Sequence, residues 1–258
     1  MNSIAANFCL QSIQFNGIIR SMIATVINAL AVLAGSIFGW LMHKKISEKI
    51  SYVVYTGVGL IALVLGISMA LEVQRILYMA LSLVLGGLIG TWINIENYIL
   101  NFGEFLKRTF AKNTKDNAAS FAHGFLDASL LFCVGALSLI GSFQAGAEGN
   151  YSLLLTKSVM DGFMAILLTA ALGIGVAFSI ITILVYQGAL TLLSAWIRPY
   201  VTDLALSELT AVGGIMVIMI GFNMLKLRDI KTANYLPALI VVLICLLFEP
   251  YLAPLWQT

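Results

Sequence analysis

The chain alternates long apolar segments with short polar ones from Met22 onward. A helix needs about 20 mostly apolar residues to cross a membrane, and these segments reach that length. Stretch 152–197 carries no charged residue between Asp161 and Arg198. As one helix it would measure about 69 Å, roughly twice a bilayer core of about 30 Å, so we expect it to turn at Gly173–Gly175. The eight expected spans are 22–42, 53–72, 76–95, 120–143, 152–172, 175–197, 208–226 and 233–249.

This pattern predicts an all-α fold, a polytopic membrane helix bundle of about eight transmembrane helices, or seven if the long stretch does not turn. Residues 1–21 have mixed polarity and are expected to form an N-terminal arm that is either interfacial or disordered. Residues 22–250 are expected to form a single transmembrane domain. The loop 96–119 is long and charged, and we expect an amphipathic helix there, on the membrane surface.

The distribution of Lys and Arg favours eight spans over seven. With eight, the loops after spans 1, 3, 5 and 7 hold ten basic residues and the opposite side holds four. Cytoplasmic loops carry an excess of basic residues, whereas seven spans would place the cluster Lys226–Lys231 outside. We therefore expect the basic loops in the cytoplasm and both termini on the extracytoplasmic side.

Two of the spans contain similar sequences. Residues 56–69 (TGVGLIALVLGISM) align with residues 210–224 (TAVGGIMVIMIGFNM) after one inserted residue. The charge distribution gives these spans opposite directions, so we expect inverted three-helix repeats, 22–95 and 175–249, around a central helical hairpin, 120–172. Inverted repeats are common in secondary transporters, with the site at the repeat interface. Apolar, glycine-rich spans also resemble one another by composition alone.

Several motifs with polar residues inside apolar runs resemble a known family. They are MIATVINALAVLAGSIFGWLM, FCVGALSLIGSFQAGAEGNYSLLLTKSVMDGF, GIGVAFS, ELTAVGGIMVIMIGFNML and ANYLPALIVV. In this order, between Met22 and Phe248, they resemble the YqgA/YdfK-like family of bacterial inner-membrane proteins. The resemblance implies a polytopic fold in the bacterial cytoplasmic membrane. It implies no activity, because the family is one of unknown function, and residues 1–21 lie outside its pattern.

Composition excludes several classes of function. Charged residues make up 10% of the chain, against about 25% in soluble domains. The net charge of +2 comes without a basic stripe, so we expect no nucleic-acid partner. Cys9, Cys133 and Cys245 form no CxxC pair, and neither a disulfide framework nor a zinc site is indicated. No GxxxxGK[ST], HExxH or GxSxG motif is present, so we expect neither enzymatic activity nor a cofactor.

Ionisable residues in the central hairpin are candidates for a functional site, since each charge costs about 2.5–3.5 kcal/mol on insertion scales. Lys157 and Asp161 are four residues apart and can pair on one helix face. Pairing alone would explain them; the alternative is contact with a solute or ion. His123 and Asp127 have the same spacing and could relay protons or form a hydrogen-bonded anchor near the interface. Asp127 is expected far from Asp161, so we propose no metal site made of paired carboxylates. The sequence does not show whether the protein binds a metal ion.

Uncharged polar residues in the spans form a second group of candidates. Ser68 and Asn223 follow Gly66 and Gly221 at corresponding positions of the two similar sequences. A glycine next to a polar residue can unwind a helix and expose its carbonyls to an ion, which would break the spans near these glycines and near Gly141. Hydrogen bonding between helices explains the same residues. The expected solute or ion pathway comprises Asp127, Ser142, Gln144, Lys157, Asp161, Ser68, Asn223 and Asn234.

Together these features favour a secondary transporter or channel for a small solute or ion, with its site near the bilayer midplane. The alternative is a membrane scaffold or accessory subunit without transport activity. The GxxxG pairs Gly35/Gly39 and Gly86/Gly90 indicate close helix packing. Such small-residue seams also favour a homo-oligomer. The expected partners are the lipid bilayer, the solute or ion, and further copies of the chain.

Overall fold

The computed structural model describes residues 2–43, 48–112, 117–133, 136–197 and 202–249. Within these ranges the chain is helical and contains no strand, which confirms the all-α prediction. The α-helices in these ranges are α1 (Asn2–His43), α2 (Glu48–Ala70), α3 (Ile76–Ile93), α4 (Ile95–Phe110), α5 (Ala118–Cys133), α6 (Ala136–Phe143), α7 (Ser152–Leu172), α8 (Ser179–Thr182), α9 (Gly188–Ile197), α10 (Asp203–Met224) and α11 (Pro237–Leu247). Between them lie the π-helical segments η1 (Gln144–Glu148) and η3 (Ile183–Gln187) and the 3-10 segments η2 (Ile174–Phe178) and η5 (Thr232–Tyr235).

In the described part of the chain, six helical segments are long and apolar enough to cross a membrane. They are Met22–Met42, Tyr52–Ala70, Ile76–Ile93, Ser152–Leu172, Ile174–Ser194 and Asp203–Met224. A seventh span results if Ala118–Cys133 and Leu137–Gly146, which are bent by 55°, count as one. The apolar helix Thr232–Leu247 is shorter. The polytopic membrane fold is thus confirmed with six or seven spans, and the count of eight stays a prediction.

The expected turn in the long apolar stretch is present. The helix α7 ends at Leu172, and Gly173 has a φ of +86°, a conformation that glycine adopts without the steric cost of a Cβ atom. The next span begins directly afterwards with η2. Residues 152–197 therefore form two spans, as their length requires.

The structure also describes most of the two segments outside the expected spans, the loop 96–119 and the N-terminal arm. The loop 96–119 contains the helix α4, in which Leu106 is buried against α5 while Phe102 and Phe105 remain exposed. An apolar exposed face is typical of a helix at a membrane interface. Residues 2–21 are helical and continue into the first span as part of α1; an interfacial position for this arm stays a prediction.

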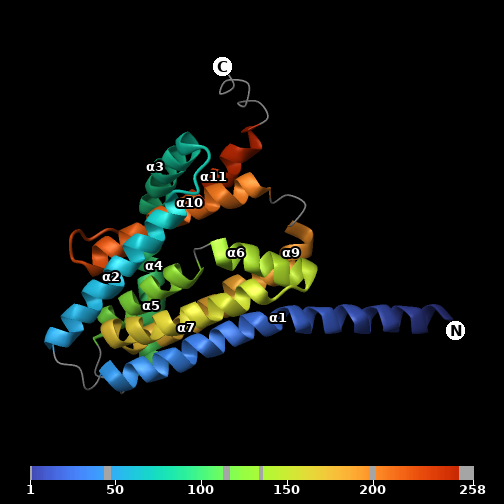
Figure 1. The fold of residues 1–258 in the computed structure, drawn as a ribbon, viewed down its shortest axis with the longest axis horizontal. Coiled ribbons are helices and arrows are strands. Elements are labelled where there is room, and N and C mark those ends of the chain that lie inside the picture. Colours follow the sequence, from blue (N-terminus) through green and yellow to red (C-terminus); the bar gives the residue numbers. More distant parts are fainter. Residues whose placement is uncertain (1, 44–47, 113–116, 134–135, 198–201, 250–258) are drawn as a thin grey trace.

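Three helix pairs form the frame of the bundle (Figure 1). The helices α1 and α7 run in the same direction, because Gly35 faces Gly162 and Gly39 faces Ile166. At Gly35 a Cβ atom would lie 2.1 Å from the carbonyl oxygen of Gly162. Small residues let helix backbones approach closely in lipid, so the packing role expected for this GxxxG pair is confirmed.

The other two pairs are antiparallel. In the pair α2–α10, Gly59 approaches Gly221 and Gly66 approaches Gly214. The helices α3 and α11 meet in the same way, with the second GxxxG pair facing Ala238 and Asn234. The largest apolar cluster then joins the spans through Val32, Val58, Leu130, Leu168 and Met216.

The glycines considered as sites of helix breaks lie instead where two helices pack closely together. The helices α2 and α10 are continuous through Gly66 and Gly221, so of the two alternatives for these positions the unwound helix is wrong. A Cβ atom at Gly66 would lie 2.7 Å from a carbonyl oxygen of α10. Gly141 lies within α6 and packs against Leu154. Helical geometry changes elsewhere, at the bend between α5 and α6 and in the π-helical segments.

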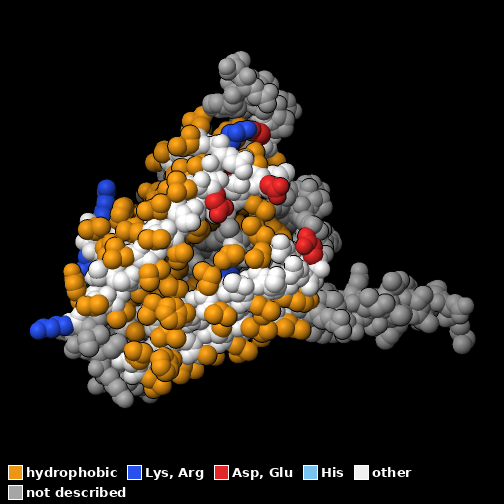
Figure 2. Space-filling model, in the orientation of Figure 1, with side chains coloured by type: hydrophobic (Ala, Val, Ile, Leu, Met, Phe, Trp, Pro, Cys, Tyr) orange, Lys and Arg blue, Asp and Glu red, His pale blue; other side chains and the backbone are white. Residues whose placement is uncertain are grey.

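The outer surface separates apolar from basic side chains. Figure 2 shows apolar side chains over most of the face in view, with several Lys and Arg side chains at its left edge. Large apolar residues such as Val64 and Leu88 are more than half exposed, as lipid contact requires. The end of the bundle where α1 ends, α2 begins and α10 ends is named the basic end here. Its described basic residues are Lys49, Lys107, Arg108, Lys112, Lys226, Arg228 and Lys231.

Candidate functional site

A buried network of polar side chains joins α1, α7 and η3. Asn28 Nδ2 donates to Asp161 Oδ2 at 3.1 Å and to Gln187 Oε1 at 3.0 Å. Lys157 forms an ion pair with the same oxygen of Asp161, as their spacing predicts. All four residues are at most 8% exposed. The cost of placing these two charges in a membrane is therefore reduced by a direct partner and a hydrogen-bond donor.

The network continues along α1 and α9 through hydroxyl groups. Gln187 Nε2 donates to Thr25 Oγ1 at 3.3 Å, and Thr25 Oγ1 lies 3.4 Å from Thr191 Oγ1. Gln187 is the last residue of a π-helical segment, and π-helical turns are frequent at functional sites. Sequence reasoning missed Thr25 and Thr191, because a threonine hydroxyl in an apolar helix gives no sign of whether it faces lipid or another helix.

Several buried polar atoms next to this network lack a hydrogen-bond partner among the described residues. They include Asn28 Oδ1 and the hydroxyls of Ser138 and Ser142 on α6, which packs against α7 and η3. An unsatisfied buried polar group costs about 1–3 kcal/mol, and contact with water or an ion is one way in which such a group is satisfied. Ser142 was a predicted pathway residue, and its burial in the bundle is compatible with that prediction.

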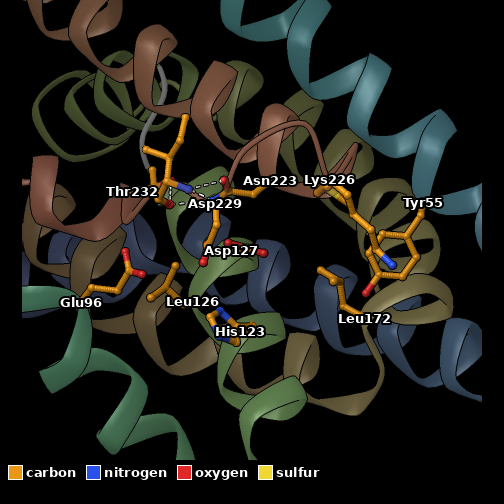
Figure 3. Close-up of a pocket in the computed structure, with 12 residues that line it drawn as sticks. Tyr55, Glu96, His123, Leu126, Asp127, Leu172, Asn223, Lys226, Asp229 and Thr232 are labelled. Carbon is orange, nitrogen blue, oxygen red and sulfur yellow. Dashed lines mark hydrogen bonds between the residues drawn. The ribbon is translucent and has the colours of Figure 1, made fainter.

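A cavity of about 230 Å³ lies at the basic end of the bundle (Figure 3). Its residues come from the first half of α2, the start of α4, the first half and middle of α5, and the end of α7, together with the end of α10, the loop that follows it and the start of η5. Its polar lining comprises Tyr55, Glu96, His123, Asp127, Asn223, Lys226, Asp229 and Thr232. Elements that are distant in sequence thus bring ionisable groups to one place.

Asp127 is one of two buried carboxylates in the lining of this cavity, the other being Glu96. Asp127 is 9% exposed, and within the part of the chain that the structure describes no hydrogen bond or ion pair involves its side chain. His123, one turn earlier on α5, is exposed and lines the same cavity (Figure 3). The structure therefore brings the two residues of the predicted proton relay to one cavity without a hydrogen bond between them, and the relay stays a prediction.

Glu96 at the start of α4 was missed from the sequence. Its Oε2 accepts from the backbone N–H of Ala233 at 3.1 Å, and its own N–H donates to Asn234 Oδ1 at 2.9 Å. Burial raises the pKa of Glu96, against the opposite effects of the Ala233 hydrogen bond and of Lys231. Its position directly after a span was the available signal, but only the folded structure shows that η5, the segment before α11, lies beside it.

The remaining predicted pathway residues have different positions. Asn223 Nδ2 donates to the carbonyl of Ile230, and the N–H of Ile230 donates back to Asn223 Oδ1, both at 2.8 Å. This pair holds the loop 225–231 at the cavity, while Asn234 fixes α4. Ser68 is exposed near the far end of α2, and Gln144 begins η1; neither lines the cavity.

A mostly apolar layer, which includes the buried hydroxyl group of Thr169 on α7, separates the cavity from the buried network. Leu172 lines the cavity, and Asp161 lies roughly 16 Å away from it along α7. Between them Ala165 and Leu168 are fully buried and pack in the core cluster with Leu130 of α5. Along the bundle the order is therefore cavity, apolar layer, and polar network. Within the described residues, no three His, Cys, Asp or Glu side chains are placed to hold a metal ion.

Comparison with known proteins identifies the family. A family model described as "Protein of unknown function (DUF554)" matches residues 23–247. The chain is 32% identical over 225 residues to "Uncharacterized membrane protein YdfK" of Bacillus subtilis (strain 168), covering 85% of this chain and 93% of that protein. It is 29% identical over 223 residues to "Uncharacterized protein YqgA" of Escherichia coli (strain K12), covering 86% and 95%. No solved structure matches the chain. The YqgA/YdfK-like resemblance is thus confirmed, and the chain belongs to the DUF554 family of proteins of unknown function.

Proposed function

We propose that this membrane protein is a secondary transporter or channel for a small solute or ion. The observation that carries the proposal is the cavity at the basic end, which reaches the buried carboxylate of Asp127 on α5, a group without a hydrogen-bond or ion-pair partner in the described part of the chain. Ionisable residues inside membrane segments are rare and mark solute, ion or proton pathways. A carboxylate that served only packing would be expected to have a partner, as Asp161 has in Lys157.

The order of layers along the bundle supports alternating access. A solute entering from the basic end would meet Asp127 first, and the apolar layer around Leu168 would then block its way to Asp161. Transporters expose a site near the midplane to one side at a time by moving one helix group against another. The structure would then correspond to a state open toward the basic end, which we propose is the cytoplasmic side of a bacterial inner membrane.

The packing of α2 against α10 supports the inverted repeat that we include in this proposal. The sequence alignment makes Gly59 equivalent to the Gly213–Gly214 pair, and Gly66 equivalent to Gly221. Exchanging the two copies therefore converts the contact Gly59–Gly221 into the contact Gly66–Gly214, and both contacts are present. This is the relation expected of two copies around a two-fold axis in the membrane plane.

Reconstitution of the full chain into liposomes tests the proposal. Concentration jumps of sodium, potassium, ammonium, guanidinium, putrescine, acetate and phosphate salts would be applied while charge movement is recorded, and vesicle swelling would report neutral solutes. We expect protein-dependent movement of at least one solute, and a reduction by about tenfold or more in Asp161→Asn, which removes the charge that Lys157 neutralises. Asp203→Asn, an exposed aspartate at the start of α10, is the matched control. Absence of movement for all solutes would support the scaffold alternative.

A further inference from the structure

We propose that the cavity at the basic end binds a small organic cation, a compound with an ammonium or guanidinium group on a short apolar body. The claim that this compound is also carried across the membrane rests on the proposed function; the claim that it binds does not. Three carboxylates line the cavity, Glu96, Asp127 and Asp229, against the ammonium group of Lys226 and the imidazole of His123. The charge balance therefore favours a cation over an anion.

The placement of Asp127 points to a ligand more directly than the charge balance. Its side chain is nine-tenths buried and lines the cavity, with no partner inside the described part of the chain. In Figure 3 it lies between Glu96 on one side and Lys226 with Tyr55 on the other. Glu96 by contrast already accepts from the N–H of Ala233. A buried carboxylate without a partner is costly, and a cation with N–H donors would satisfy it through charge-assisted hydrogen bonds.

The chemistry of the walls favours an organic cation over a metal ion. The three carboxylates come from α4, α5 and the loop after α10, and no three acidic, histidine or cysteine side chains of the described residues converge on one point. A group with several N–H donors can bond acceptors that are spread around a cavity, whereas a directly bound metal needs them together.

Apolar groups complete the same cavity. Leu126, Leu172 and Met224 line it, and Tyr55 adds an aromatic ring. Methylene groups of a ligand would gain from contact with these side chains, and a cation near an aromatic ring gains a further attraction. A hydrated inorganic ion would make no use of such walls. The cavity of about 230 Å³ is small compared with pockets for drug-sized ligands, so the compound is small.

Two substitutions with opposite expected effects test the inference. Binding of putrescine and of guanidinium to the purified full chain in detergent would be measured by calorimetry at constant ionic strength. We expect Asp127→Asn to weaken binding about tenfold or more, as for loss of a hydrogen bond to a charged group. Lys226→Gln should tighten binding, because it removes the one ammonium group that repels the ligand. General damage to the fold cannot explain a tighter complex.

Matched controls and other ligands complete the experiment. Asp203→Asn and Lys112→Gln change exposed residues outside the cavity and should leave the affinity as in the wild type. Failure of both organic cations to bind would overturn the inference. The inference would also be overturned if potassium or manganese bound and the organic cations did not. Binding of acetate or phosphate that is lost in Lys226→Gln would overturn it too. If the cation binds in a way that depends on Asp127 but no solute moves in liposomes, this inference stands and the proposed transport function is wrong. If a solute moves and its flux does not change in Asp127→Asn, the transport function stands and this inference is wrong.

Discussion

At the scale of the residue, Glu96 shows how burial sets the charge of a side chain at the basic end. It is 7% exposed and holds α4 against η5, the segment before α11, through Ala233 and Asn234. Its raised pKa means that the folded protein binds a proton more tightly than the unfolded chain does. The stability that this gives is complete below the ordinary pKa of a glutamate and is lost as the pH rises through the raised pKa of the folded state.

We therefore expect Glu96→Gln to be more stable than the wild type at about pH 8, and the difference to disappear by about pH 4. Glutamine stays neutral at both values and can still accept from the N–H of Ala233. The midpoint of thermal unfolding in detergent, measured across this range, is the readout. Glu104→Gln on the same helix is the matched control, because Glu104 is partly exposed and pairs only with Arg108 at 3.5 Å among the described residues. A wild type as stable as the variant at pH 8 would contradict the prediction.

Spacing along a helix predicts contacts within that helix and little beyond it. The interval of four residues gave the pair Lys157–Asp161 and placed His123 beside Asp127, and both relations are present. The partners from other helices depend on how the spans pack, and helical periodicity carries no information on that. Asn28 reaches Asp161 across a helix contact. For the same reason the contact of Glu96 with η5 could not be predicted from the sequence.

At the scale of the element, glycine has two opposite uses that the sequence does not distinguish. Gly173 ends a helix in a conformation with positive φ, whereas Gly66 lies in a continuous helix and lets α10 approach. Both are surrounded by apolar residues in the sequence. The turn at Gly173 was predictable because the stretch was too long for one span. No such length argument exists for the second and seventh spans, so the sequence alone leaves unwinding and helix packing as alternatives at Gly66 and Gly221.

Two alanine substitutions in α2 test the packing role. A Cβ atom at Gly66 would lie 2.7 Å from the carbonyl oxygen of Gly214, whereas a Cβ atom at Gly57 would meet nothing within 4 Å. We expect Gly66→Ala to lower the free energy of unfolding by about 1–3 kcal/mol through overpacking. Gly57→Ala should be neutral or stabilising by up to about 1 kcal/mol, because alanine is the better helix former. Unfolding by denaturant in mixed micelles compares the two, and equal stability would mean that α2 and α10 are not in close contact.

At the scale of the whole molecule, the directions of the paired helices agree with a chain that crosses the membrane eight times. The pair α1–α7 is parallel, and the pairs α2–α10 and α3–α11 are antiparallel. Alternating spans give these relations when the bent pair α5–α6 and the short helix α11 each count as a crossing. The position of the cavity agrees with eight crossings as well. Eight crossings place the start of α2, the start of α5, the end of α7 and the end of α10 on one side of the membrane, and the lining residues from these helices lie toward those ends.

Labelling of single cysteines decides this path. In a chain with Cys9, Cys133 and Cys245 replaced by serine, cysteine would be introduced at Lys112, Asn150 or Arg228, all of which are exposed. With the basic loops inside the cell, a membrane-impermeant maleimide should label Asn150→Cys in intact cells, and Lys112→Cys and Arg228→Cys only after permeabilisation. If α5–α6 re-enters without crossing, Asn150→Cys would be labelled like Lys112→Cys. If Arg228→Cys and Lys112→Cys differ, an odd number of spans separates them, and the two similar sequences would no longer be inverted. Agreement with the eight-span pattern would place the cavity and Asp127 on the cytoplasmic side, from which a solute would then have to enter.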